Sequence, residues 1–139
     1  MELTQNAFLR IELQENDVLL FTTLKSEITE EEWLECQQMV DKWYQYGKEN
    51  NLQLGILLDM TSISFLKSKF YISWKDKYLK NKENTEKYVY GATILIHNFI
   101  IRHFINGFFT IYRLSKPFKV VKSIEEGYEF LEKHSTFLL

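Results

Sequence analysis

The sequence predicts an α/β fold, a single domain with a mixed, mostly parallel sheet of about five strands and about four helices in the order β-β-α-β-α-β-α-β-α. Two continuous apolar runs, residues 52–60 and 88–96, are typical of strands buried on both faces of a parallel sheet. Between such runs lie segments whose apolar residues recur every three or four positions, as in amphipathic helices. The length of 139 residues fits one domain.

The first two strands are predicted to form a hairpin. Residues 7–13 alternate apolar and polar side chains, which predicts a half-buried strand. Residues 14–17 are a polar turn, and the run over 18–24 is rich in Val, Leu, Phe and Thr, which favour strands. An antiparallel pair at this end makes the sheet mixed.

A long helix is predicted over residues 29–49. Thr29 and Glu32 have the spacing of a capping box, which marks a helix start. Apolar residues follow at helical spacing, at Trp33, Cys36, Val40, Trp43 and Gly47. Cys36 is therefore predicted to be a small core residue and no nucleophile, because no basic neighbour is evident to lower its pKa.

The second half of the chain continues the alternation of helices and strands. Residues 66–81 predict a helix, residues 81–87 a polar loop and residues 118–121 a short strand. A second capping box at residues 123–126 opens the last helix. The expected core face of the helix over 66–81 has residues spaced by four: Leu66, Phe70, Trp74 and Tyr78.

Residues 99–112 predict a helix that is apolar around most of its circumference, with Asn98 as its N-cap. Such a helix is either deeply buried or covered by a partner. A two-fold interface with a second copy would cover it, which predicts a homodimer. The candidate interface consists of Phe99, Ile101, Phe104 and Phe108, with Ile101 expected to face outward.

Composition excludes several classes of function. The net charge of −2, with 17 basic and 19 acidic residues, indicates no nucleic-acid partner, and the lysines between residues 67 and 82 are predicted to lie on a solvated helix face. A lone cysteine favours a reducing compartment, and the first residues do not resemble a signal peptide, so the cytoplasm is expected. Polar residues interrupt the apolar zone around 92–112, so no membrane span is predicted. Abundant Lys, Asn and Ile suggest an AT-rich genome, as in many bacteria.

The search for catalytic motifs is mostly negative. The chain has no glycine-rich nucleotide loop and no Gly-x-Ser-x-Gly elbow. Its three histidines lack the paired spacing of a zinc site, so we expect no metal and no cofactor. His97 follows a strand at the end where α/β proteins bind ligands, but a solvated or helix-capping role is favoured for it. Asp59, Ser62 and His97 could instead meet at the strand ends as a catalytic group, but their spacing in the sequence does not require it. We therefore expect that the protein is not an enzyme.

Asp59 ends a buried strand, at the position where doubly wound sheets place functional carboxylates. The favoured interpretation is that Asp59 caps the following turn through backbone N–H groups. Four hydroxyls come after it, at Thr61, Ser62, Ser64 and Ser68. They are expected to cap the next helix, and they are also candidates for phosphorylation, since a helix N-terminus stabilises added negative charge.

The stretch Ile56-Leu57-Leu58-Asp59-Met60-Thr61-Ser62-Ile63-Ser64-Phe65-Leu66-Lys67-Ser68 resembles the central motif of STAS domains, the anti-sigma-factor antagonists and their relatives. The closing stretch over residues 116–127 also resembles that group, and the predicted element order agrees with it over essentially the whole chain. The likeness is nearest to the SpoIIAA-like subgroup, which shares its fold with lipid-binding Sec14-type domains. Two departures stand out: Lys67 replaces the family's Asp, and Lys69 with Phe70 replaces a small Ser-Gly pair.

The resemblance implies a non-catalytic regulator that binds a protein partner, a kinase or an anti-sigma-like protein, and whose matching serine, Ser68 here, is phosphorylated. The candidate regulatory and partner-binding residues are Asp59, Thr61, Ser62, Ser64, Ser68 and His97. The alternative is a carrier of a small apolar ligand or lipid, with a cavity lined by aromatic side chains: Trp74, Tyr78, Phe99, Phe104, Phe108, Phe109 and Tyr112. Ordinary core packing of these aromatics is the simpler interpretation.

Overall fold

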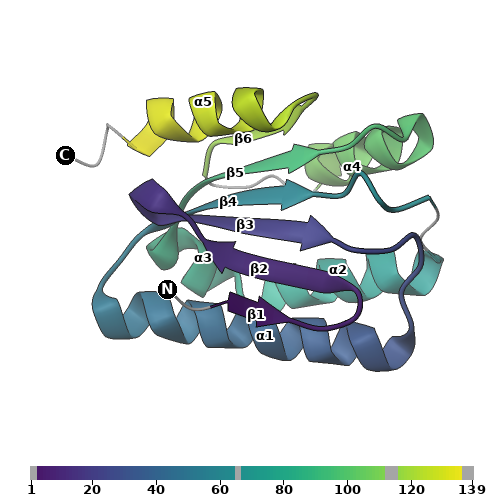
Figure 1. Ribbon diagram of the computed structural model, residues 1–139, viewed down its shortest axis with the longest axis horizontal. Coiled ribbons are helices and arrows are strands. Elements are labelled where there is room, and N and C mark those ends of the chain that lie inside the picture. The colour runs from purple at the N-terminus through teal and green to yellow at the C-terminus, as the bar shows by residue number, and fades with distance from the viewer. Residues whose placement is uncertain (1–2, 65–66, 112–115, 136–139) are drawn as a thin grey trace.

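The computed structural model describes residues 3–64, 67–111 and 116–135 (Figure 1). These residues contain one six-stranded sheet with the strand order β1-β2-β3-β4-β5-β6. The first three strands are antiparallel, and β3 to β6 are parallel to one another, which confirms the predicted mixed, mostly parallel sheet. The strands are β1 (Leu3–Gln5), β2 (Leu9–Leu13), β3 (Val18–Thr23), β4 (Leu54–Asp59), β5 (Val89–Leu95) and β6 (Phe118–Val121).

Five α-helices are described, and they cover both faces of the sheet (Figure 1). α5 packs on β4, β5 and β6 from one side. α1, α2 and α4 contribute to the larger core on the other side, and α3 contacts α1 and β5. The helices are α1 (Glu30–Asn50), α2 (Ser68–Lys80), α3 (Lys82–Tyr88), α4 (Phe99–Ile111) and α5 (Ile124–Ser135).

The structure adds two elements to the predicted order. β1 is only three residues long, too short for a periodic pattern, and it is recognised only by its pairing with β2. The segment predicted as a polar loop over 81–87 instead forms α3, which buries none of its residues fully. Hydrogen bonds to distant residues connect this helix to the rest of the fold. The Tyr44 hydroxyl lies 2.8 Å from Oγ1 of Thr85, and Gln53 donates to the carbonyl oxygen of Lys87.

The boundaries elsewhere follow the sequence closely. Thr29 and Glu32 form the predicted capping box at the start of α1. A short 3-10 turn, Glu15–Asp17, closes the predicted hairpin, and Asn16 and Asp17 have φ of 63° and 59°, a left-handed conformation that these residue types tolerate. α2 begins at Ser68, and Leu66, predicted on its core face, lies outside the described residues, as does residue 112 at the end of the predicted helix over 99–112.

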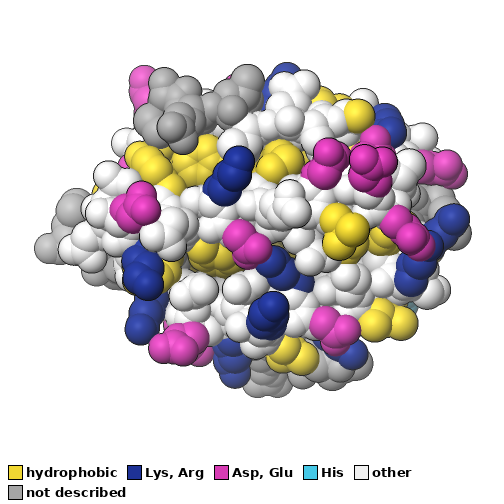
Figure 2. Space-filling view, turned by 90° about the horizontal axis from the view of Figure 1, so that it is seen from below, with side chains coloured by type: hydrophobic (Ala, Val, Ile, Leu, Met, Phe, Trp, Pro, Cys, Tyr) yellow, Lys and Arg dark blue, Asp and Glu magenta, His cyan; other side chains and the backbone are white. Residues whose placement is uncertain are grey.

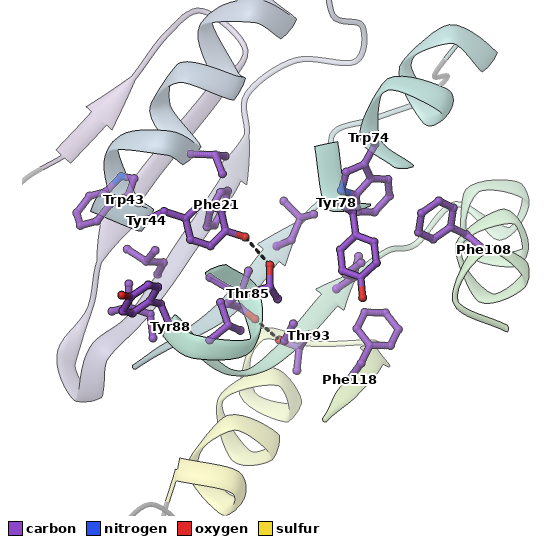
Figure 3. Close-up of a pocket in the computed structure, with 18 residues that line it drawn as sticks. Phe21, Trp43, Tyr44, Trp74, Tyr78, Thr85, Tyr88, Thr93, Phe108 and Phe118 are labelled. Carbon is purple, nitrogen blue, oxygen red and sulfur yellow. Dashed lines mark hydrogen bonds between the residues drawn. The ribbon is translucent and has the colours of Figure 1, made fainter. Parts of the chain in front are cut away.

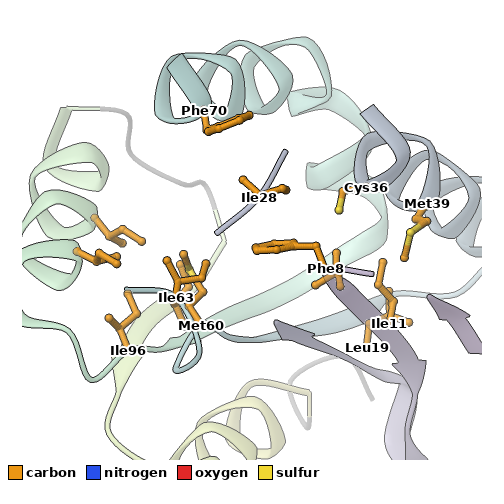
Figure 4. Packing of buried hydrophobic residues seen from close by; sticks show 14 of the residues in the cluster. Phe8, Ile11, Leu19, Ile28, Cys36, Met39, Met60, Ile63, Phe70 and Ile96 are labelled. Carbon is orange, nitrogen blue, oxygen red and sulfur yellow. The ribbon is translucent and has the colours of Figure 1, made fainter. Parts of the chain in front are cut away.

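The larger core lies between the sheet and α1, α2 and α4. Figure 4 shows the ring of Phe8 within this cluster, near Ile28, Met60 and Ile63. Trp43 of α1 is 3% exposed, and its indole N–H donates to Oγ1 of Thr4 at 2.9 Å, so the helix is fixed to the sheet edge by both apolar and polar contacts. Burial of this apolar surface is the main stabilising contribution to the fold.

A smaller core lies beneath α5. Leu131 of α5 packs with Val18, Leu57 and Tyr90 of the sheet. Gly127 lies where α5 is close to β4, since a Cβ at this position would be 2.9 Å from Cδ1 of Leu57. Glycine therefore allows the helix to lie close to the sheet.

The face seen in Figure 2 carries basic and acidic side chains intermingled, with hydrophobic side chains in separate patches. Ion pairs also join α1 and α2, as between Lys77 and Asp41. Within the described residues, no helix is both long and apolar enough to span a lipid bilayer.

Candidate functional site

Asp59 is used by the turn that follows β4. Its Oδ1 accepts hydrogen bonds from the backbone N–H of Thr61 at 3.0 Å and from the Thr61 hydroxyl at 2.7 Å. Its carbonyl oxygen accepts a bond from the buried hydroxyl of Thr23 at 2.9 Å. The capping interpretation of Asp59 is therefore confirmed, and the carboxylate is partly exposed at the carboxyl end of the parallel strands.

The four candidate hydroxyls lie on the surface after β4. Thr61, Ser62, Ser64 and Ser68 are all exposed, and Ser68 is the first residue of α2. The expectation that one of them caps α2 was wrong: the N-cap is Lys67, and no side-chain hydrogen bond caps this helix. The hydroxyl of Ser68 is thus accessible at a helix N-terminus, between two lysines in sequence.

Asn98 connects the loops after β4 and β5. Its Oδ1 accepts from the N–H groups of Ile100 and Ile101, at 2.9 and 3.1 Å, which confirms it as the N-cap of α4. Its Nδ2 donates to the carbonyl oxygen of Ser64 at 3.2 Å. This contact places the serine-containing loop beside the start of α4.

His97 precedes this cap and is exposed. Among the described hydrogen bonds and ion pairs, none joins His97 to Asp59 or Ser62, and the Asp59 carboxylate bonds Thr61. In the part of the chain that the structure describes, no three His, Cys, Asp or Glu side chains are grouped to hold a metal ion.

α4 has one buried face and one exposed apolar face. Ile101, Ile105 and Phe108 are buried and follow helical spacing toward the sheet, so the expectation that Ile101 faces outward was wrong. Phe99, Ile100 and Phe104 have 69%, 78% and 42% of their surfaces exposed. Of the predicted interface residues, Phe99 and Phe104 are therefore available to a partner, whereas Ile101 and Phe108 belong to the core.

The exposed face of α4 continues onto α2. The rings of Tyr71 and Phe104 are 3.8 Å apart, and Ile72 is 56% exposed. A hollow of about 370 Å³ lies between the two helices, with Lys75 and His103 at its wall. We call the exposed residues Ile72, Phe99, Ile100 and Phe104, together with the half-buried Tyr71, the α2–α4 surface.

Polar contacts hold α2 and α3 to α1. The indole N–H of Trp33 donates to Oγ of Ser73 at 2.7 Å, and Lys77 pairs with Asp41 at 2.6 Å. Lys69 of α2 pairs with Glu30 of α1, and this hydrogen bond lowers the pKa of Glu30. Only Phe70 of α2 is fully buried, so this helix depends on contacts at its surface.

Two adjoining apolar pockets lie between these helices and the sheet. One, of about 200 Å³, extends to α3 and α4, and we call it the α3-side pocket (Figure 3). The other, of about 210 Å³, extends along α1 and α2, and we call it the α2-side pocket. The two have six lining residues in common: Phe21, Val40, Tyr44, Leu58, Trp74 and Tyr78. Each pocket by itself is smaller than typical small-molecule sites, which span about 300–1,000 Å³.

The aromatic side chains that the sequence suggested for a cavity divide into three groups. Trp74, Tyr78 and Phe108 line the α3-side pocket, and the rings of Trp74 and Phe108 are stacked with centroids 5.6 Å apart (Figure 3). Phe99 and Phe104 are exposed on α4. The side chain of Phe109 and all of Tyr112 lie outside the description.

Asn81, between α2 and α3, was missed by sequence reasoning, because it falls at the start of a segment predicted as loop. Its Nδ2 is buried without a hydrogen-bond partner, and the residue lines the α2-side pocket. An unpaired buried donor costs about 1–3 kcal/mol. The signal was its spacing, since Asn81 stands three residues after Tyr78 and continues the buried face of α2.

Cys36 also lines the α2-side pocket, but its thiol is a poor nucleophile because it is buried. The thiol is 5% exposed, and burial raises its pKa to about 11. It accepts a hydrogen bond from Nδ2 of Asn6 at 3.6 Å. The prediction that Cys36 is a core residue is confirmed, and its thiol remains protonated at neutral pH.

No protein-family model matches the sequence, and no curated protein matches it either. Among solved structures, the chain is similar to a protein of the DUF3478 family from Shewanella loihica PV-4, described as uncharacterised and as having a SpoIIAA-like fold. The TM-score is 0.63 at 16% sequence identity, over 92% of this chain and 98% of that one. The chain therefore has a SpoIIAA-like fold, in agreement with the likeness seen in its motifs.

Proposed function

We propose that this chain is a non-catalytic regulatory domain that binds a protein partner through the α2–α4 surface. The observation that carries the proposal is the grouping of large exposed apolar side chains, Phe99, Ile100 and Phe104, beside an accessible serine-containing loop. Contiguous exposed apolar surface of this kind marks interaction sites, and aromatic residues supply much of the binding energy at interfaces. The SpoIIAA-like fold is commonly regulatory, which supports the same assignment.

The partner that the resemblance implies is a serine kinase or an anti-sigma-like protein. Ser68 is exposed at the first position of α2, where a phosphate would be stabilised by the helix N-terminus. Phosphate on Ser68 would also compete with Glu30 for Lys69, loosening one of the links between α1 and α2. Modification would therefore alter the surface that the partner contacts. In a reducing compartment such as the cytoplasm, Cys36 stays a thiol.

The test is native mass spectrometry of the protein isolated gently from its own cells, with two matched variants. Ile100→Glu places a charge on the α2–α4 surface, in the first turn of α4 where an acidic residue suits the helix dipole. Leu34→Glu places the same charge on α1, at a residue that is 60% exposed. We expect a stoichiometric partner with the wild type and with Leu34→Glu, and its loss with Ile100→Glu. Equal retention by both variants would contradict this assignment.

A second function, a carrier of a small apolar ligand, is favoured by a different observation. The two pockets adjoin, are lined mainly by apolar and aromatic side chains, and lie partly beneath α2, of which only Phe70 is fully buried. Ordinary protein cores are close-packed, with few voids larger than a water molecule. A small molecule retained in the same native mass spectrum, with no protein partner, would favour the carrier over the regulator.

A further inference from the structure

The junction of α2 and α3 contributes an asparagine to the wall of the α2-side pocket. Asn81 follows the last residue of α2 and precedes α3, and its side chain makes no capping bond to α3. Nδ2 of Asn81 is buried without a hydrogen-bond partner, and the residue lines the α2-side pocket. Buried amides are almost always paired, so an unpaired one on a pocket wall indicates a group that a ligand would satisfy.

Three other polar side chains on this wall, Gln37, Tyr44 and Lys77, already have partners. Nε2 of Gln37 donates to Oγ of Ser73 at 3.3 Å. The hydroxyls of Tyr44 and Thr85 are 2.8 Å apart. Lys77, the charged residue on the wall, is 2.6 Å from Asp41, so its charge is matched. The pocket therefore offers a neutral hydrogen-bond donor and no free charge, which disfavours an ionised ligand group because burying it would be costly.

We propose that Asn81 is the polar anchor of a ligand site, and that the α2-side pocket binds an apolar molecule carrying one neutral hydrogen-bond acceptor, such as a ketone or ester carbonyl. Nδ2 of Asn81 donates to that oxygen, and the apolar body lies against Trp74 and Tyr78, which both pockets share. This inference rests on the carrier function above and specifies the chemistry of its ligand.

The experiment compares two probes of the same shape, 2-acetylnaphthalene and 2-ethylnaphthalene, by equilibrium dialysis against the full chain. The two differ only in the carbonyl oxygen that Asn81 would recognise. We expect the ketone to bind about three- to tenfold more tightly than the hydrocarbon, the range of one net hydrogen bond. We expect 2-naphthoate, which carries a charge instead, to bind more weakly than the ketone.

Two variants identify the atom responsible. Asn81→Leu should lower the affinity for the ketone to that for the hydrocarbon, while leaving the hydrocarbon's affinity within about twofold. Because no protein hydrogen bond of Nδ2 is lost, the unliganded variant should resist urea as well as or better than the wild type. Gln37→Leu is the matched control: it removes an amide from the same wall whose N–H is already used by Ser73, and it should keep the preference for the ketone.

The outcomes separate the two levels of the proposal. Equal binding of both uncharged probes by the wild type, tighter binding of the naphthoate, or a ketone preference that survives Asn81→Leu would overturn the assignment of Asn81 while leaving the carrier function in place. Lower urea resistance of unliganded Asn81→Leu would make Asn81 a structural residue and would also overturn it. Failure of every probe to bind the wild type would remove the carrier function together with this inference.

Discussion

Asn98 and Ser64 are joined by a hydrogen bond of 3.2 Å, from Nδ2 of the asparagine to the carbonyl oxygen of the serine. The same asparagine caps α4 through its Oδ1. One side chain therefore sets both the start of a helix and the position of the loop that carries the candidate hydroxyls. The two parts of the proposed partner-binding face are coupled through it.

Replacing Asn98 with Ala is expected to remove the link between the start of α4 and the loop over residues 61–64. Loss of an N-cap costs about 0.5–2 kcal/mol, measurable as a lower urea midpoint. The loop over residues 61–64 should also exchange its amide hydrogens faster. Asn98→Asp keeps the cap but replaces the donor to Ser64 with a carboxylate oxygen that repels the Ser64 carbonyl, so it should retain most of the stability but show the faster exchange. Unchanged exchange in both variants would mean that the loop is held by other contacts.

The same substitution with Glu is expected to change the free energy of unfolding by very different amounts at two adjacent isoleucines of α4. Ile101→Glu buries a carboxylate in the core, where Ile101 is 3% exposed, and should reduce the free energy of unfolding by about 3 kcal/mol or more. Ile100→Glu, at 78% exposure, should change it by less than about 0.5 kcal/mol.

The same pair of variants tests the homodimer. If a second copy covers the exposed face of α4, folded Ile100→Glu should be monomeric by light scattering while the wild type is a dimer. An identical mass for the two proteins would exclude this face as the dimer interface. Ile101→Glu is unsuitable for that test, because unfolding would obscure the change in mass.

Two glycines are expected to differ in their tolerance of alanine. A Cβ at Gly55 of β4 would be 2.5 Å from the hydroxyl oxygen of Tyr90, so Gly55→Ala should destabilise by about 1–3 kcal/mol. A Cβ at Gly107 of α4 would meet nothing within 4 Å, so Gly107→Ala should stabilise by up to about 1 kcal/mol through helix propensity. Thermal unfolding of the two variants measures both, and equal effects would contradict the packing of Tyr90 over β4.

Glu32, at the start of α1, is expected to make the free energy of unfolding depend on pH. The hydrogen bond from Lys25, followed by the one from the backbone of Thr29, lowers the pKa of Glu32 below its ordinary value of 4.5. The unfolded chain therefore binds a proton more readily at this residue, so its stabilising contribution is complete above about pH 4.5 and is lost as the pH falls through the folded pKa. Urea unfolding between pH 7 and pH 3 should show a smaller loss for Glu32→Gln than for the wild type. Parallel curves would show that this carboxylate is not linked to folding.

The reactivity of Cys36 is expected to report on unfolding. Because burial raises the pKa of the thiol to about 11, the folded protein should react with iodoacetamide at pH 8 far more slowly than the urea-unfolded chain. Rapid labelling of the native protein would indicate that the α2-side pocket, which Cys36 lines, opens readily. A ligand bound in that pocket should slow the labelling further.

The sequence by itself determined the order of the long elements, because hydrophobic period and capping residues are local signals. The alternation in residues 7–13, the apolar run that became β4 and the Thr29–Glu32 capping box each depend on a few neighbouring residues. Asp59 could likewise be assigned to its turn, since it bonds a residue two positions away. The resemblance to the SpoIIAA-like group supplied the fold as a whole.

Only the tertiary structure decided which side of each apolar element is buried and which polar groups find partners. Ile100 and Ile101 are chemically identical neighbours, and only the packing of α4 against the larger core distinguishes them. α3 has no apolar stripe that would predict a helix from the sequence. Its helical structure is evident only from the fold, in which it contacts α1 and β5. Nδ2 of Asn81 is buried without a hydrogen-bond partner, and residues of α1, α2 and the sheet line the same pocket. Burial and hydrogen-bond pairing depend on residues that are distant in the sequence, so a local sequence pattern cannot predict them.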